Sequence, residues 1–85
     1  MELPEIETHL LNAIDSFSGQ LLREQLDDMR ELACAGEPGV AFENLCTQVF
    51  EYDLRVSPAI ASLLEQLGVA MGISRDYWER LDKET

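Results

Sequence analysis

The strongest constraint on the fold lies in residues 36–53, where apolar side chains recur at the spacing of a single helix face. They occupy positions i, i+3, i+4, i+7 and i+8 and consist of Phe42, Leu45, Cys46, Val49 and Phe50. This period is typical of an amphipathic helix that buries one side against a core. Pro38 lies just before the stripe, where the fixed φ angle of proline suits a first helical turn. The segment therefore predicts a helix with one buried face.

The rest of this segment is acidic, with carboxylates at Glu37, Glu43, Glu51 and Asp53. The chain of 85 residues carries 17 acidic and 6 basic side chains, for a formal net charge of −11. Such a charge repels nucleic-acid phosphates and anionic lipids, and it favours rapid association with a basic protein. We therefore expect a cationic protein partner and no direct binding to nucleic acid or membranes. The alternative is that the charge serves solubility alone.

Three further long helices and one short helix are predicted around this segment. Their expected boundaries, read from capping residues, prolines and glycines, are Pro4 to about Phe17, Ser18 to Gly36, Ser57-Pro58 to Gly72, and a short last helix from Ser74. Short loops of about two to five residues should make sequential helices neighbours in space. The expected fold is all-α, a small antiparallel bundle of four helices plus a short C-terminal helix, with one domain over residues 1–85.

The apolar stripes of these helices predict the core. Its expected members are Leu26, Met29, Leu32, Phe42, Leu45, Cys46, Val49, Leu63, Leu64 and Leu67. The last helix should close over one end of this core with Tyr77, Trp78 and Leu81.

The sequence predicts a cytoplasmic protein without a metal or cofactor. The segment from Met1 to Glu5 has neither the basic region nor the apolar stretch of a signal peptide, and no apolar run is long enough to span a membrane. Cys34 and Cys46 are expected to be small buried hydrophobic residues rather than a disulfide pair. His9 is the single histidine and cannot seed a zinc site alone, so it should be an ordinary helix residue.

Catalysis is not expected. His9 is the only histidine available as a base for nucleophilic catalysis, and it lies far in sequence from both cysteines. Phosphate-binding glycine loops and calcium loops are absent from the sequence. Asp15-Ser16-Phe17 is similar to the phosphopantetheine site of acyl carrier proteins, whose serine begins the second helix. Here Ser16 falls at the end of the first predicted helix, so we do not favour this reading.

A longer pattern resembles the small MafI-type immunity proteins, which are encoded beside secreted bacterial polymorphic toxins. The resembling residues are Ala35-Gly36-Glu37, Ala41-Phe42-Glu43-Asn44-Leu45-Cys46-Thr47-Gln48, Glu51-Tyr52-Asp53, Val56-Ser57, Leu67-Gly68, Met71-Gly72 and Tyr77-Trp78. The resemblance covers roughly residues 20–82, and residues 1–20 match nothing in it. It implies an all-α cytoplasmic protein that binds one cognate toxin domain, often a nuclease, and blocks it without an active site of its own.

The acidic composition agrees with this implication, because nuclease active sites are cationic where they bind phosphate. The candidate toxin-binding residues are Glu43, Glu51, Tyr52 and Asp53, with Glu37 and Asp28 towards the rim. A second acidic face, Glu24, Asp27, Asp28 and Glu31, is the alternative contact. The alternative functions are a nucleic-acid mimic that inhibits many DNA-binding proteins and a non-enzymatic adaptor bundle.

Overall fold

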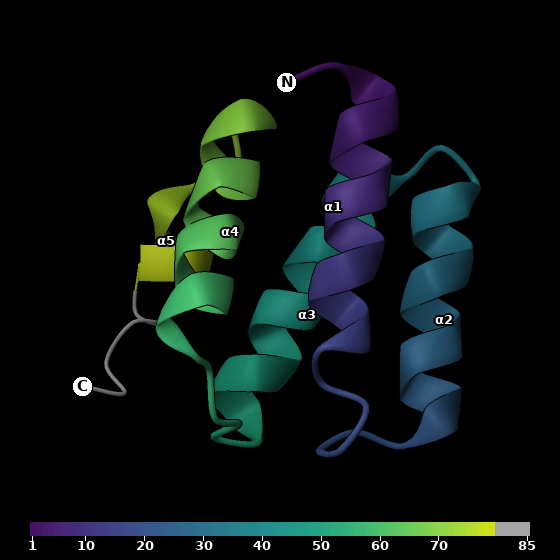
Figure 1. Cartoon of the computed structure of the whole chain (residues 1–85), viewed down its shortest axis with the longest axis vertical. Coiled ribbons are helices and arrows are strands. Elements are labelled where there is room, and N and C mark those ends of the chain that lie inside the picture. The colour runs from purple at the N-terminus through teal and green to yellow at the C-terminus, as the bar shows by residue number, and fades with distance from the viewer. Residues whose placement is uncertain (80–85) are drawn as a thin grey trace.

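The computed structural model describes residues 1–79, which form five helices and no strand. The helices are α1 (Leu3–Asp15), α2 (Arg23–Cys34), α3 (Pro38–Glu51), α4 (Pro58–Ala70) and α5 (Arg75–Trp78). The four long helices alternate in direction, and α5 lies beside α4 (Figure 1). The predicted all-α bundle with a short C-terminal helix is confirmed.

Local hydrogen bonds at the predicted positions explain where two helices, α4 and α5, begin. Ser57 precedes Pro58, and its Oγ accepts a hydrogen bond of 3.2 Å from the backbone N–H of Ile60. Ser74 caps α5 in the same way, by accepting from the N–H of Asp76. Each hydroxyl thus satisfies a backbone donor that has no partner within its own helix.

Three helices end in the same hydrogen-bonded motif. After α2, α3 and α4 the chain passes through a left-handed residue, which is Gly36 (φ 86°), Asp53 (φ 51°) and Gly72 (φ 67°) respectively. In each case the N–H one residue later donates to a carbonyl five residues back, at 2.9–3.0 Å. This is the Schellman arrangement, in which glycine is favoured because it lacks a Cβ. Asp53 is the exception in residue type.

The second helix begins later than predicted. Ser18 does not cap it, because the Ser18 hydroxyl donates backward to the carbonyl of Asp15 at 2.6 Å. The cap position is Leu22, whose N–H donates to the side chain of Gln25 at 2.9 Å. Phe17, predicted within the first helix, lies beyond its end and is nevertheless buried. Residues 16–22 therefore form a longer connection than expected.

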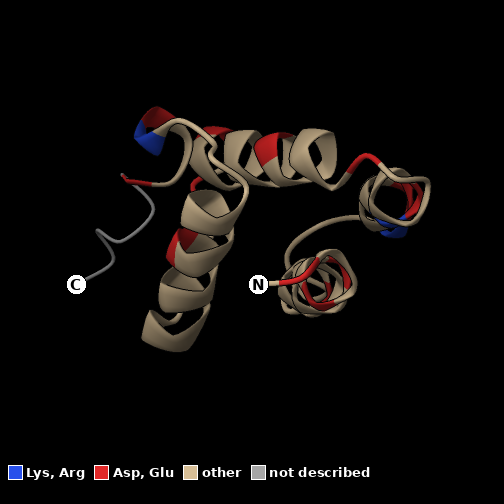
Figure 2. Cartoon of the chain, turned by 90° about the horizontal axis from the view of Figure 1, so that it is seen from above, with Lys and Arg blue, Asp and Glu red and all other residues tan. Residues whose placement is uncertain are grey.

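The arrangement of helices differs from a simple sequential bundle. α1 packs against α2, α3 and α4, whereas α4 contacts α1 and α5 closely rather than α3. Seen from above, α1 and α2 are viewed almost end-on, whereas α3 and α4 are viewed from the side (Figure 2). The expectation that all sequential helices are neighbours is therefore wrong for α3 and α4.

One side chain fixes the start of α4 beside the end of α1. The amide of Gln20 donates to the carbonyl of Arg55 at 3.0 Å and accepts from the Arg55 N–H at 2.8 Å. Both backbone groups of Arg55 are thereby satisfied by a residue 35 positions earlier. This clamp joins the α1–α2 connection to the α3–α4 connection, and it holds the start of α4 near the end of α1.

The core contains most of the predicted residues. Those that are buried are Leu26, Met29, Phe42, Leu45, Cys46, Val49, Leu64 and Leu67. Leu32 and Leu63 are only partly buried and pack at the margin. Phe50 does not complete the buried stripe, because it falls at the edge of the α3 core face and remains 52% exposed. The core also includes Ile6, Leu10, Ala13, Ile14 and Phe17 from the first segment.

The C-terminal helix closes over the core through Trp78. Its indole lies over Gly68, where an added Cβ would be 2.8 Å from Cε2 and closer still to Nε1 and Cδ1. The indole N–H donates to the carbonyl of Ile73 at 3.3 Å, and the Arg75 guanidinium is 6.0 Å from the ring centroid. Tyr77 remains 38% exposed. Leu81, also expected here, lies outside the described residues.

We predict that Gly68→Ala displaces Trp78 and lowers the free energy of unfolding by about 1–3 kcal/mol, because the indole and the new methyl group cannot share this space. Fluorescence of the single tryptophan and urea unfolding measure the two effects. In a Trp78→Ala background the same substitution should instead stabilise the protein by roughly 0.5–1 kcal/mol, since alanine favours a helix over glycine. Gly19→Ala, with no atom within 4 Å of its Cβ, is the control. Destabilisation in both backgrounds would contradict the packing.

Candidate acidic docking site

The acidic side chains lie at the surface of every long helix. No charged side chain is buried among residues 1–79, and red carboxylate-bearing positions occur on α1, α2, α3 and α4 (Figure 2). Ion pairs within this part of the chain involve three acidic residues, which are Asp15 and Asp27 with Arg30, and Glu79 with Arg75. Most described carboxylates therefore project into solvent without an intramolecular counter-charge.

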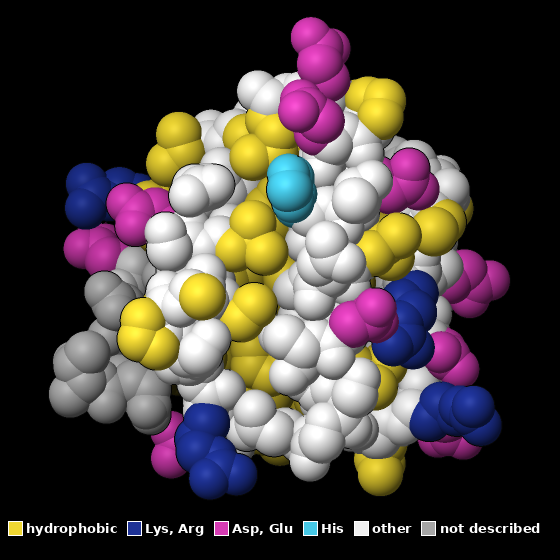
Figure 3. All heavy atoms as spheres, viewed as in Figure 1, with side chains coloured by type: hydrophobic (Ala, Val, Ile, Leu, Met, Phe, Trp, Pro, Cys, Tyr) yellow, Lys and Arg dark blue, Asp and Glu magenta, His cyan; other side chains and the backbone are white. Residues whose placement is uncertain are grey.

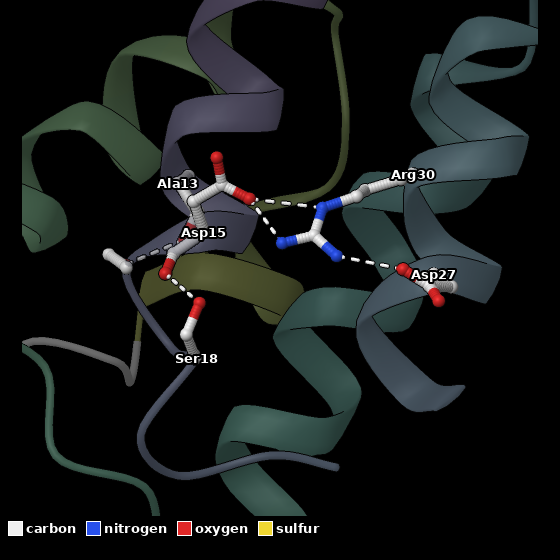
Figure 4. Close-up of polar contacts among 6 residues, drawn as sticks. Ala13, Asp15, Ser18, Asp27 and Arg30 are labelled. Carbon is white, nitrogen blue, oxygen red and sulfur yellow. Dashed lines mark hydrogen bonds and ion pairs between the residues drawn. The ribbon is translucent and has the colours of Figure 1, made fainter. Parts of the chain in front are cut away.

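Arg30 neutralises part of the acidic face of α2. Its Nε donates to Asp15 at 3.0 Å and its Nη1 to Asp27 at 2.9 Å, and Figure 4 shows the guanidinium between the two carboxylates. The hydrogen bond to Asp15 is the largest effect and raises the pKa of Arg30. Arg30 thus joins α2 to α1 through Asp15, whereas its pair with Asp27 lies within α2. Glu24, Asp28 and Glu31 remain as the unpaired acids of the alternative contact face.

The end of α3 brings together three predicted site residues. Glu51 is the last residue of the helix, Tyr52 is its cap and Asp53 follows in the left-handed conformation. All three side chains are exposed, Tyr52 to 56%, and neither carboxylate forms an ion pair with another described residue. We call Glu51, Tyr52 and Asp53 the α3 exit.

The other predicted site residues do not all join this group. Glu43 is partly exposed on α3, two turns before Glu51. Glu37 precedes the first turn of the 14-residue α3, and a helix of this length separates its ends by about 20 Å. Asp28 is exposed on the neighbouring helix α2. Glu37 thus lies at the far end of α3 from the α3 exit, and Asp28 lies on a different helix.

Both carboxylates of the α3 exit occupy places that local electrostatics or sterics disfavour. Glu51 lies in the last turn of α3, where the helix dipole presents partial negative charge, and that turn contains no basic residue. Asp53 adopts the backbone conformation that glycine provides at the two equivalent helix ends. Stabilisation of the helix end therefore does not explain Glu51, and glycine would suit the backbone at position 53 better than Asp53 does.

The positive φ of Asp53 escaped the sequence analysis. Its signal was present, because an Asp followed by the apolar Leu54 just beyond an amphipathic helix fits a Schellman ending. Aspartate is also among the residues that tolerate a left-handed backbone. Gly36 and Gly72 were recognisable as helix ends because glycine adopts a positive φ readily, whereas Asp53 occupies the same position without being a glycine.

The two thiols have different environments. Cys46 is 1% exposed, and burial, followed by the charge of Glu43, raises its pKa to about 12. Cys34 is exposed, which corrects the expectation that both cysteines are buried. Its pKa is raised by desolvation and then by its hydrogen bond with Glu7. Neither thiol is therefore poised as a thiolate nucleophile near neutral pH.

Three other features bear on function: possible metal ligands, the Ser16 hydroxyl and the length of the apolar helices. Residues 1–79 contain no cluster of three or more His, Cys, Asp or Glu arranged to hold a metal ion. Ser16 follows the end of α1, and its hydroxyl donates to the carbonyl of Ala13 at 2.6 Å. This is not the helix-start position of a phosphopantetheine serine. None of the helices described is both long and apolar enough to cross a bilayer.

Comparison of the chain with protein-family models, curated proteins and solved structures gives no match. The resemblance to immunity proteins therefore stays a prediction that rests on the residues quoted above.

We predict that Asp53→Gly leaves the free energy of unfolding unchanged or raises it by at most about 1 kcal/mol, whereas Asp53→Ala lowers it by about 1 kcal/mol. The physical reason is the positive φ, which glycine adopts freely and alanine does not. Chemical denaturation of the three proteins measures the difference. Equal stability of the alanine and glycine variants would contradict the left-handed assignment.

We predict that one thiol reacts with a chromogenic disulfide reagent in the native protein and two react after denaturation, because Cys34 is exposed and Cys46 is buried. Cys34→Ser should abolish the native reaction, while Cys46→Ala should preserve it. Reaction of both native thiols at the same rate would contradict these environments.

We also predict a pH dependence of stability from Cys46. Its pKa is raised on folding, so the Cys46 thiol loses its proton at a lower pH in the unfolded chain than in the folded protein. The contribution of Cys46 to the free energy of unfolding should therefore fall as the pH rises from about 9 towards 12.

Proposed function

We propose that this protein is an immunity-type inhibitor that binds and neutralises a cognate secreted bacterial toxin. A nuclease is the favoured toxin class. The observation that carries the proposal is the α3 exit, where two unpaired carboxylates flank the exposed Tyr52 in positions unfavourable to helix α3 itself. Local rules are broken most often where a residue serves function rather than folding.

The charge of the chain supports a cationic partner. A formal net charge of −11, with the described acids at the surface, creates a field that attracts a basic protein and accelerates encounter. Nuclease domains present positive charge where they bind phosphate. An acidic helix end can therefore compete with nucleic acid for the same surface.

Charge alone supplies rate and specificity more than affinity. Affinity commonly depends on a few aromatic or charged anchors that lose their water at the centre of the interface. Tyr52 meets this requirement, because it is 56% exposed and sits on backbone fixed by the Schellman bond between the N–H of Leu54 and the carbonyl of Val49. A rigid aromatic anchor loses little conformational entropy on binding.

The test compares two variants that change net charge equally at different places. Glu51→Lys with Asp53→Asn alters the α3 exit, and Glu24→Lys with Glu31→Gln alters the outer face of α2. We expect the α3-exit variant to lose about 10- to 100-fold in affinity for the toxin domain encoded beside this chain, and the α2 variant to lose much less. Calorimetry and protection of toxin-challenged cells measure the two outcomes.

The stability of the same variant gives an independent check. Lysine at position 51 complements the negative end of α3, so the α3-exit variant should be as stable as the wild type or more stable by about 0.3–1 kcal/mol. Loss of binding with retained stability would assign the residues to recognition. Full protection by this variant, with loss in the α2 variant, would place the contact on the α2 face. Failure of the wild type to protect would contradict the immunity function.

Salt and partner breadth separate the alternatives. Raising the salt concentration should slow association more than it speeds dissociation if the acidic surface steers encounter. An adaptor that binds through apolar surface would show little salt dependence. A nucleic-acid mimic would bind many DNA-binding proteins, whereas an immunity protein binds its own toxin.

A further inference from the structure

A groove lies between the end of α1 and the start of α4. It has a volume of about 470 Å³, within the range of small-ligand sites. Its lining includes Phe17, Gln20, Arg55, Val56, Ser57 and Ile60. Figure 3 shows hydrophobic side chains gathered along the line between these two helices. The buried Phe17 and Val56 make the deepest part of this lining apolar.

The groove is held in shape without help from a ligand. The Gln20 amide binds both backbone groups of Arg55, so its polar atoms are used and the two connections are fixed relative to each other. Ser57 accepts from the N–H of Ile60, which fixes the first turn of α4. A preformed cavity of this kind loses little entropy on binding.

The rim of the groove carries positive charge in an otherwise acidic protein. Arg55 is exposed and forms no ion pair with a described carboxylate. The Ser57 hydroxyl accepts a hydrogen bond and still has its own proton to donate. The first turn of α4, a helix of 13 residues, adds the positive end of its dipole. An anionic group is therefore favoured at the rim, beside an apolar floor.

We propose that this groove binds the C-terminal residue of a polypeptide, with an apolar side chain on the floor and the α-carboxylate at Arg55 and Ser57. A terminal residue carries both groups on one Cα, as the adjacent floor and rim require. Arg55 follows Asp53 by two residues, so a protein docked on the α3 exit can also reach the groove. That the polypeptide is the toxin rests on the proposed function, whereas the ligand chemistry of the groove does not.

The test titrates the whole protein with three small probes and follows its NMR spectrum. N-acetyl-L-phenylalanine carries the apolar group and the carboxylate, its amide carries the apolar group alone, and N-acetylglycine carries the carboxylate alone. We expect weak saturable binding of the first probe, with shifts centred on Phe17, Val56 and Ile60. It should bind at least about threefold tighter than either other probe, the range expected for one exposed charge contact.

Two arginine variants identify the source of the preference. Arg55→Gln should abolish the difference between the acid and its amide, whereas Arg23→Gln, which removes another exposed arginine without an ion pair, should leave it intact. Because both side chains are exposed, both variants should keep the wild-type thermal unfolding curve. Equal binding of acid and amide, shifts outside the groove, or absence of saturation would overturn the proposal. These outcomes do not involve the toxin and leave the test of the α3 exit unaffected.

Discussion

Burial of one face of α1 is the constraint on which the other helices depend. Leu10, Ala13 and Ile14 have no exposed surface, and α1 contacts α2, α3 and α4. Removing an apolar side chain from such a site costs both its transfer from water and the cavity left behind. The outer positions of α1 are correspondingly free to be polar. The charged side chains of residues 1–79 lie outside this shared core, because burying an unpaired charge would cost its hydration.

The sequence predicted the helices better than their arrangement. Helical spacing identified the buried faces of α3 and α4, and Ser57-Pro58, Gly36 and Gly72 marked boundaries that the structure confirms. It did not show that α1 would be central. The spacing of apolar residues identifies the buried face of a helix but not the helix that packs against that face. The Gln20–Arg55 clamp joins residues 35 positions apart, and no local pattern reveals such a pair.

The candidate site was predictable only where its residues are adjacent in the sequence. Glu51, Tyr52 and Asp53 are consecutive, so the sequence alone brings them together, and the structure adds their exposure and the left-handed Asp53. Glu37 and Asp28 shared the acidic pattern but lie at the other end of α3 and on α2. Phe50 shows where helical spacing stops being informative. It lies at the edge of the apolar stripe of α3, and spacing alone does not tell whether such a residue is buried or exposed.

The charge of the chain changes sign over a short distance, from Asp53 to Arg55, and different hydrogen bonds fix the backbone at the two residues. Asp53 belongs to the Schellman motif that ends α3, while the backbone of Arg55 is bound by the Gln20 amide before the start of α4. Uniform negative charge would attract any cationic surface, whereas adjacent opposite charges on fixed backbone favour one orientation of one partner. Under the proposed function, specificity would therefore depend on where unpaired basic groups of residues 1–79, such as Arg55, interrupt the acidic surface.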